Sequence, residues 1–295
     1  MITQFSRRNL ISSAAAAGGL AASLAAGGLG SRRAAATTSL DFSNAEEGLR
    51  AYAKLVGSTE AATVHYWYAG TIYGVLPGED SQPVMGFAGL AKNIWRPLDD
   101  GTFSQRIFDV GYYADLETGE PLDEFVNPFT GEINYPVHYT SGPSQFTRKA
   151  ERRNWQTSGD DVWLEESLAF KMPNWLDPVE WPLASSGKTL HFRYTNTYRG
   201  TLSDLANPDI PSTPSLLGWN AITDWYPFML MGQQPGFLNW ISQGRKINDF
   251  SEVSSQTLRY LEAHFPDYLD LDAPWTEPAN NYVQYMEQRR PVSNE

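Results

Sequence analysis

From residue 63 onward, the chain is a succession of segments in which side-chain character alternates every second residue. The clearest are residues 64–75, 84–95 and 103–115, which are rich in aromatic and β-branched residues. A period of two is that of a β-strand, whose successive side chains point to opposite faces. The stretches 115–119 and 127–131 both end in Thr-Gly, and glycine accepts the positive φ that closes a hairpin loop. The chain is therefore expected to build an antiparallel sheet.

Further strands are expected in the rest of the chain, at residues 121–126, 132–140, 163–170, 189–198, 219–231 and 237–247. A sheet of about eight long strands tends to curl until it closes, because closure removes exposed edges. The expected fold class is therefore mainly β: an antiparallel, closed or nearly closed β-barrel of the calycin/lipocalin-like kind. A flat sandwich is the less favoured alternative.

A helix is expected near each end of this barrel. In residues 43–58, Ser43 is the expected N-cap and Glu46 completes a capping box. Residues 251–265 carry Val253, Leu258 and Leu261 at helical spacing. The tail from Asp267 is acidic and contains prolines, and we expect it to lie on the surface.

The first 36 residues are typical of a twin-arginine (Tat) signal peptide. Arg7 and Arg8 precede a long run of small, weakly apolar residues, which ends near a small-residue cleavage site at 34–36. The glycine pairs and low hydrophobicity of the run argue against a stable membrane span. We expect one transient partner, the Tat translocase, and a periplasmic or extracellular protein. Residues 37–295 are expected to form a single β-barrel domain.

Charge and composition exclude several classes of function. The net charge is −12, and a chain this acidic is repelled by nucleic acid and by anionic membranes. There is no cysteine, which excludes disulfides and thiolate metal sites. No phosphate-binding loop, nucleophile elbow or zinc-protease motif is present, and the four histidines are too dispersed to indicate a metal site. We assign no metal ligand and expect no organic cofactor. A metal site formed by His with Asp or Glu from different strands stays open, as does the oligomeric state.

The catalytic candidates are His138, Asp224 and Tyr135. Alternation within residues 132–140 places His138 on a polar face. If this face lines a barrel lumen, His138 is a buried titratable group suited to proton transfer; if it faces outward, it is solvated and inert. Three acids, Asp109, Asp115 and Asp224, lie within aromatic strands. Asp224 directly precedes Trp225, and an acid between bulky aromatic side chains can have a raised pKa.

Other aromatic and basic residues are candidates for binding a substrate. An arginine beside His191 on an inward face would hold a carboxylate or phenolate, whereas on the outer face both would be ordinary surface residues. Tyrosines and tryptophans next to the candidate acid would form an aromatic wall. The full set of binding candidates is Tyr194, Arg193, Arg106, Trp225, Tyr226 and His65.

Two segments resemble a bacterial and fungal family of unknown function, domain-of-unknown-function family 1838. The first is Gly111-Tyr-Tyr-Ala-Asp-Leu-Glu-Thr-Gly-Glu120, followed by Asn127-Pro-Phe-Thr-Gly-Glu132 and Val137-His138. The second is Asp224-Trp-Tyr-Pro-Phe-Met-Leu-Met-Gly232 with Pro235-Gly236. The resemblance covers most of residues 45–265. It implies that His138, Asn127 and residues 225–232 belong to a shared feature, either a pocket or a structural kernel, but it implies no reaction.

Three functions agree with these patterns. The first is an exported enzyme that acts without an organic cofactor on a small apolar or aromatic molecule, by His/Tyr/Asp acid–base chemistry of the lyase, isomerase or hydratase type. The second is a lipocalin-like carrier whose aromatic cavity binds the same kind of molecule without chemistry. The third is a structural or interaction protein whose aromatic residues are all core. A lumen group with a strongly shifted pKa would distinguish the enzyme from the carrier.

Overall fold

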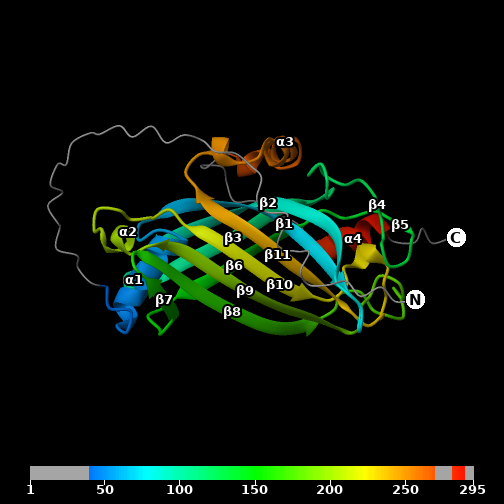
Figure 1. The fold of residues 1–295 in the computed structure, drawn as a ribbon, viewed down its shortest axis with the longest axis horizontal. Helices are drawn as coiled ribbons and strands as arrows, with labels where there is room; N and C mark the ends of the chain where they lie inside the picture. Colours follow the sequence, from blue (N-terminus) through cyan, green and yellow to red (C-terminus); the bar gives the residue numbers. More distant parts are fainter. Residues whose placement is uncertain (1–39, 270–280, 290–295) are drawn as a thin grey trace, which may run out of the picture. The chain divides into compact units, whose positions relative to one another are not determined.

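The computed structural model describes residues 40–269 and 281–289, so the signal peptide expected over residues 1–36 lies outside the described residues. Nine strands form one antiparallel sheet in the order β6-β3-β2-β1-β11-β10-β9-β8-β7 (Figure 1). They are β1 (Ala62–Val75), β2 (Gln82–Pro97), β3 (Phe103–Ala114), β6 (Thr140–Arg148), β7 (Asn154–Ser158), β8 (Asp161–Pro173), β9 (Thr189–Thr201), β10 (Leu216–Thr223) and β11 (Phe237–Ile247). The mainly β, antiparallel fold class is confirmed.

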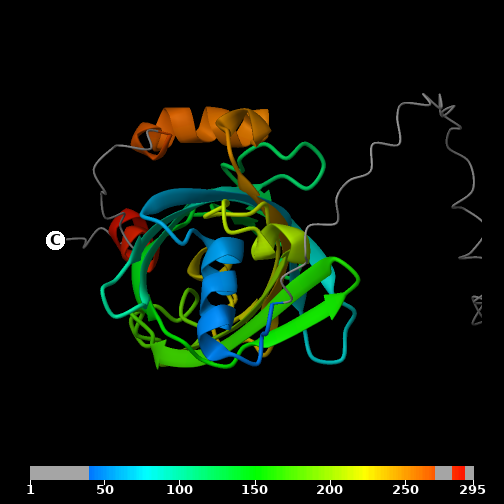
Figure 2. The same cartoon turned by 90° about the vertical axis from the view of Figure 1, so that its left-hand side faces the viewer.

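The sheet curls strongly but does not close, which corrects the expected closed or nearly closed barrel (Figure 2). Its end strands are β6 and β7, and within residues 40–269 no ladder of hydrogen bonds joins them. One reason is that β7 is short and pairs with β8 only over residues 161–165. A second is that the pairing of β3 with β6 shifts between Ile107 and Asp109, and such a bulge bends a strand and ends regular pairing. We call the resulting gap between β6 and the β7–β8 hairpin the seam.

Helix α1 (Ala45–Val56) lies across the opening at one end of the curled sheet (Figure 2). Its N-cap is Asn44 rather than the expected Ser43, because the Asn44 side-chain oxygen accepts hydrogen bonds from the amides of Glu46 and Glu47. Its buried residues, among them Leu49, Tyr52 and Leu55, pack on the concave face of the sheet. The helix therefore fills this end of the half-barrel with apolar side chains.

Helix α3 (Ser255–His264) covers the opposite, convex face. It follows the 3-10 turn η3 (Phe250–Glu252), and the Ser254 hydroxyl caps it by accepting from the amide of Thr257. Leu261 and Tyr260 pack against Leu90 and Val110 of the sheet. The convex face of β2 and β3 is thus buried as well, which explains why these strands carry bulky residues on both faces.

The remaining elements are short. Between β3 and β6 lie only β4 (Phe125–Val126) and β5 (Ile133–Asn134), where two full strands were expected, because the prolines of this segment have no N–H to donate to a ladder. The chain after β10 turns into η2 (Pro227–Met229), whereas a strand had been expected to continue to Met231. The other short helices are α2 (Leu202–Ala206), η4 (Pro266–Tyr268) and α4 (Asn281–Arg289).

The part of the tail that is described does more than lie on the surface. Tyr285 of α4 is buried in the apolar cluster at the end of the half-barrel opposite α1, and Tyr282 packs against the same cluster. This cluster also contains Phe228 and Met229 of η2 and Trp240 of β11. The concave face of the sheet is therefore closed by apolar side chains at both ends.

Candidate functional site

Polar side chains occupy the concave face between the two apolar clusters. Tyr68 of β1 packs against both clusters, which places it between them. Asp109 of β3 and Tyr194 of β9 point to the same face, as strand alternation and the register of the sheet require. Tyr68, Asp109 and Tyr194 are half-buried. We call this set, together with Tyr139, the polar belt.

Two tyrosine hydroxyls in the belt converge above a glycine. The Tyr139 hydroxyl donates to the carbonyl of Ala88 at 3.1 Å, and the Tyr68 hydroxyl lies beside it. A Cβ atom on Gly89 would lie 2.6 Å from the Tyr68 hydroxyl and 2.8 Å from the Tyr139 hydroxyl. A Cβ atom on Gly111 would lie 2.2 Å from the Tyr139 hydroxyl. The two glycines thus leave the space in which the phenols meet.

Asp109 lies beside this phenol pair, two positions before Gly111 on the same face of β3. Its charge acts on both Tyr68 and Tyr139. Burial raises the pKa of the Asp109 carboxyl to about 7, because the anion loses its hydration without gaining a cation. Burial also raises the pKa values of Tyr68 and Tyr139 well above the usual value. The belt therefore combines neutral phenol donors with a carboxyl group that titrates near neutral pH.

At the α1 end, the belt meets a cluster of charges that bridges the seam. The Tyr52 hydroxyl donates to Glu166 of β8 at 3.3 Å. The guanidinium groups of Arg148 and Arg153 lie over the Tyr52 ring, at 5.5 and 4.5 Å from its centre. Burial raises the pKa of Glu166, and the two arginines partly offset that rise. One residue of α1 thus connects the two ends of the open sheet.

Farther along the seam, apolar side chains of the concave face reach solvent. Beyond Glu165, β8 has no strand partner on its outer side in the described part of the chain. Leu168 and Phe170, which share the face of Tyr194 by their register with β9, are 45% and 38% exposed. The ring of Phe170 lies 5.3 Å from that of Phe192. An apolar edge therefore leads from solvent toward the polar belt.

The structure places His138 on the other side of the sheet from the belt. The segment expected to be a strand over residues 132–140 is irregular, and it directs Val137 and Tyr139 inward and His138 outward. His138 Nδ1 accepts a hydrogen bond from the amide of Tyr113 at 3.1 Å, and the ring packs edge-on against Tyr260 of α3. Burial, with a smaller contribution from His264, lowers the pKa of His138 to about 4. The inward orientation on which its catalytic role depends is thus corrected: the imidazole faces outward, where it is a neutral ring beneath α3 rather than a solvated one.

Asp224 and Tyr135 are not brought into the belt. The Asp224 carboxylate accepts from the backbone amide of His191 at 2.6 Å and lies 3.2 Å from its Nδ1. The His191 side chain is 65% exposed and that of Asp224 is 24% exposed, so the pair lies on the rim of the sheet in solvent. Tyr135 is 48% exposed. The catalytic roles assigned to these residues stay predictions, and the geometry does not assemble them into one site.

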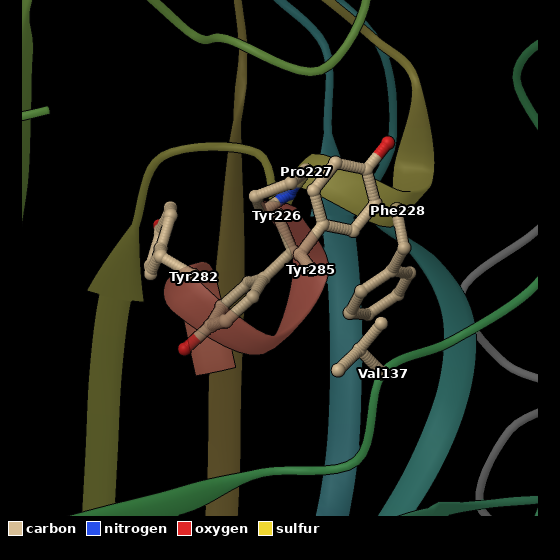
Figure 3. A pocket seen from close by; sticks show the side chains of 6 residues that line it. All are labelled: Val137, Tyr226, Pro227, Phe228, Tyr282 and Tyr285. Carbon is tan, nitrogen blue, oxygen red and sulfur yellow. The ribbon is translucent and has the colours of Figure 1, made fainter. Parts of the chain in front are cut away.

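Trp225 and Tyr226 belong to the apolar cluster at the α4 end. The indole N–H of Trp225 donates to the carbonyl of Gln234 at 2.9 Å. Tyr226 faces Phe228 and Tyr282, and Figure 3 shows these rings together with Tyr285 and Val137. The space between them measures about 10 Å³, which is room for about one water molecule. This region is packed core rather than a place for a substrate.

Of the other binding candidates, only Tyr194 lies on the concave face. Arg193 is exposed on the convex face, so the alternative that it faces inward is corrected. Arg106 also points away from Gln105, which bonds to Arg148 inside. His65 is buried on the convex side, edge-on to Phe250, and burial, assisted by Lys92, lowers its pKa to about 4.

Asp109 stands out in the sequence as an acid within an aromatic strand, but its partners do not. Tyr68, Tyr139 and Glu166 resemble many other residues of this aromatic, acidic chain. The available signal was the pair of glycines, Gly89 and Gly111, because a glycine inside a strand often marks a close approach of another group.

Within the described residues, no group of three or more His, Cys, Asp or Glu side chains is arranged to hold a metal ion. No helix in residues 40–269 or 281–289 has the length and apolar character required to span a bilayer.

Comparison with known proteins gives a family but no activity. A family model described as "Protein of unknown function (DUF1838)" matches residues 61–289, a range that includes both signature segments and the whole polar belt. No curated protein matches the chain. The match confirms the family resemblance found in the sequence.

The close approach at Gly89 makes this position intolerant of any side chain. In Gly89→Ala, the new methyl group would lie 2.4 Å from the carbonyl oxygen of Val110 and would also displace both hydroxyls, so we expect a loss of about 1–3 kcal/mol in the free energy of unfolding. The control is Gly218→Ala, because its nearest neighbour would be 3.8 Å away; we expect a change within about 0.5 kcal/mol. Urea unfolding measures both, and equal effects would contradict the proposed crowding.

The raised pKa of Asp109 predicts a stability that depends on pH. The native state holds this proton up to about pH 7, whereas the unfolded state releases it near pH 4. The Asp109 contribution to stability therefore falls as pH rises from about 4 to 7 and is constant above that range. We compare the free energy of unfolding of Asp109→Asn with that of the parent protein. We expect this difference to be roughly 2–4 kcal/mol more favourable to the variant at pH 8 than at pH 4. Urea unfolding at both pH values measures the gain, with Asp99→Asn in an exposed turn as control; a difference independent of pH would contradict it.

Proposed function

The chain belongs to the family of unknown function DUF1838, and because that description names no reaction, we propose from the polar belt that it is a proton-transfer enzyme of the isomerase or lyase type. The observation that carries this proposal is the convergence of the Tyr68 and Tyr139 hydroxyls above Gly89, beside Asp109. No organic cofactor is part of the proposal. The acid–base pair moves from the His138 and Asp224 of the sequence prediction to Asp109 and the phenols.

In this proposal, the Asp109 carboxylate removes a proton from a carbon next to a carbonyl group of the substrate. The C–H electron pair moves into an enolate, and the negative charge develops on the carbonyl oxygen. The Tyr68 hydroxyl donates a hydrogen bond to that oxygen, beside Tyr139, whose own proton goes to the Ala88 carbonyl. Return of the proton to another carbon gives the isomer and restores the carboxylate.

The substrate class follows from the surroundings. The belt is walled by aromatic rings, among them Tyr194, Phe192 and Trp219, which are half-buried on the concave face. A charged substrate would lose its hydration there, and the nearby charges of Arg148 and Arg153 already act on Glu166. We therefore propose a small, uncharged apolar or aromatic ketone, which enters along the seam past Leu168 and Phe170.

A carrier without catalysis is the second candidate. The exposed apolar edge at Leu168 and Phe170 favours it, since uptake of an apolar ligand requires such an edge but no acid–base group. The two candidates differ in one respect: a carrier has no use for a carboxyl group that changes charge near pH 7.

Deuterium exchange tests the enzyme against the carrier. The probe is 2-tetralone, an uncharged aromatic ketone with acidic C–H bonds, in D2O at pH 8 with proton NMR as the readout. We expect the protein to accelerate exchange over buffer, Asp109→Asn to abolish the acceleration, and Tyr68→Phe to reduce it by about 10-fold or more. Asp99→Asn, far from the belt in an exposed turn, is the control.

Binding of the same probe, followed by tryptophan fluorescence, separates the remaining outcomes. Binding without exchange would support the carrier and overturn the enzyme. Exchange that survives Asp109→Asn would place the base elsewhere. If the probe shows no binding and no exchange, the proposal that the belt receives this class of molecule is overturned.

We also propose that the protein is exported by the Tat pathway to the periplasm or beyond. The support is the sequence of residues 1–36 alone, with Arg7 and Arg8 before the apolar run. The change Arg7→Lys with Arg8→Lys preserves charge and removes the motif, so we expect the precursor to accumulate in the cytoplasm. Fractionation of bacterial cells that produce the full chain measures this, and undiminished export of the double variant would exclude the pathway.

A further inference from the structure

The convex face carries a groove that the proposed chemistry does not use. It lies over β1, β2 and β3, between the turn at residues 115–119 and the start of α3, and has a volume of about 280 Å³. Small-molecule sites begin at roughly 300 Å³, so the space suits one ring rather than a large cofactor. We call it the outer groove.

Residues with small side chains form the floor of the outer groove. The register pairs Ala69 with Ala88, and Thr71 with Gly86. On the next strand, Gly86 pairs with Ala114. These five neighbouring positions of the convex face thus carry nothing larger than a threonine, whereas α3 covers the bulky residues of the same strands farther along.

Two aromatic rings, those of Trp67 and Tyr112, line the outer groove on the side of α3, and both are held in place. The Thr257 hydroxyl, which is fully buried, lies 3.4 Å from the indole nitrogen of Trp67 and 3.4 Å from the hydroxyl of Tyr112. An ion pair of 2.7 Å between Arg259 of α3 and Glu120 connects the helix to the turn on the other side. Walls fixed in this way lose little conformational entropy when a ligand binds.

The polar groups at the rim indicate what the ligand offers. Asp115 Oδ1 accepts from the amides of Glu117 and Thr118 and from the Thr118 hydroxyl, and these bonds lower the pKa of its carboxyl. Among the described residues, none donates a hydrogen bond to Asp115 Oδ2, so this oxygen can accept one from a ligand hydroxyl. Ser254 and Gln256 line the opposite rim. No Lys, Arg or His lines the groove, which disfavours an anionic ligand.

We propose that the outer groove is a second binding site, for an uncharged pyranose ring of an oligosaccharide. The ring stacks its C–H face on the side of Trp67 that lines the groove, since the Arg245 guanidinium already lies over that indole at 5.7 Å from its centre. The sugar hydroxyls donate to Asp115 and bond to Ser254 and Gln256. A flat apolar molecule would cover Asp115 Oδ2 without donating a hydrogen bond to it, and a sugar acid would be repelled by the carboxylate. The proposal is independent of the polar belt, which lies on the other face of the sheet.

The test follows the indole N–H resonance of Trp67 in nitrogen-15 NMR spectra, assigned by its loss in Trp67→Phe. The probes are cellotetraose, maltotetraose and chitotetraose, with trigalacturonate as the charged comparison and 2-naphthol as the planar one. We expect at least one neutral tetrasaccharide to shift the Trp67 resonance in a saturable manner, whereas trigalacturonate and 2-naphthol do not. We expect Ala69→Leu to weaken this binding by about 10-fold or more, because its side chain fills the floor of the groove.

Two variants guard against indirect effects. Thr71→Leu fills the other end of the outer groove and should act like Ala69→Leu if either variant proves unstable. Ile222→Ala changes an exposed convex residue outside the groove and should bind as the parent does, as should Asp109→Asn in the polar belt. The proposal is overturned if no neutral tetrasaccharide shifts the resonance, if the shift persists in both filled variants, or if trigalacturonate or 2-naphthol binds equally well.

Discussion

The open seam is the constraint on which the rest of the fold depends. Because hydrogen bonds do not join β6 to β7, side chains must hold the two ends of the curled sheet together. They meet at Tyr52, whose hydroxyl bonds to Glu166 from one end and whose ring receives Arg148 from the other. Helix α1 therefore stabilises the curled sheet, because its residue Tyr52 connects the two end strands in place of hydrogen bonds between them.

Buried charge makes this connection sensitive to its partners. Glu166 is desolvated, and the arginines compensate only partly for that cost. A buried lysine also holds the end of α1. Lys246 of β11 donates to the carbonyls of Lys54 and Gly57, at 2.9 and 3.1 Å. Burial lowers the pKa of Lys246 to about 7. The position of α1 thus rests on polar contacts made in a medium of low dielectric constant, where each is strong when complete and costly when broken.

Local pattern predicted the strands well and the closure of the sheet poorly. Residues 237–247 form a strand with the expected bounds because their alternation is uninterrupted and both neighbours are long. Closure depends on the length of β7 and on the bulge near Asp109, and neither leaves a periodic signal. Alternation correctly separates His138 from Val137 and Tyr139, but it cannot tell which of the two faces turns toward the interior.

The candidate site was predictable only in part for a related reason. Asp109 stands out as an acid among aromatic residues, and this local feature alone drew attention to it. Its relation to Tyr68 and Tyr139 is set by the register of three strands and by two glycines, which is information that one strand does not contain. Sequence reasoning therefore found one chemical group of the belt and missed the geometry that surrounds it.

The unpaired half of β8 bears on how copies of the protein could associate. A bare strand edge is a template onto which another chain can add, and that would also block the way to the concave face. Here the exposed edge carries Lys171 and ends at Pro173, a charge and an imino acid that both oppose such addition. The same few residues thus oppose edge-to-edge pairing with a second copy along this half of β8.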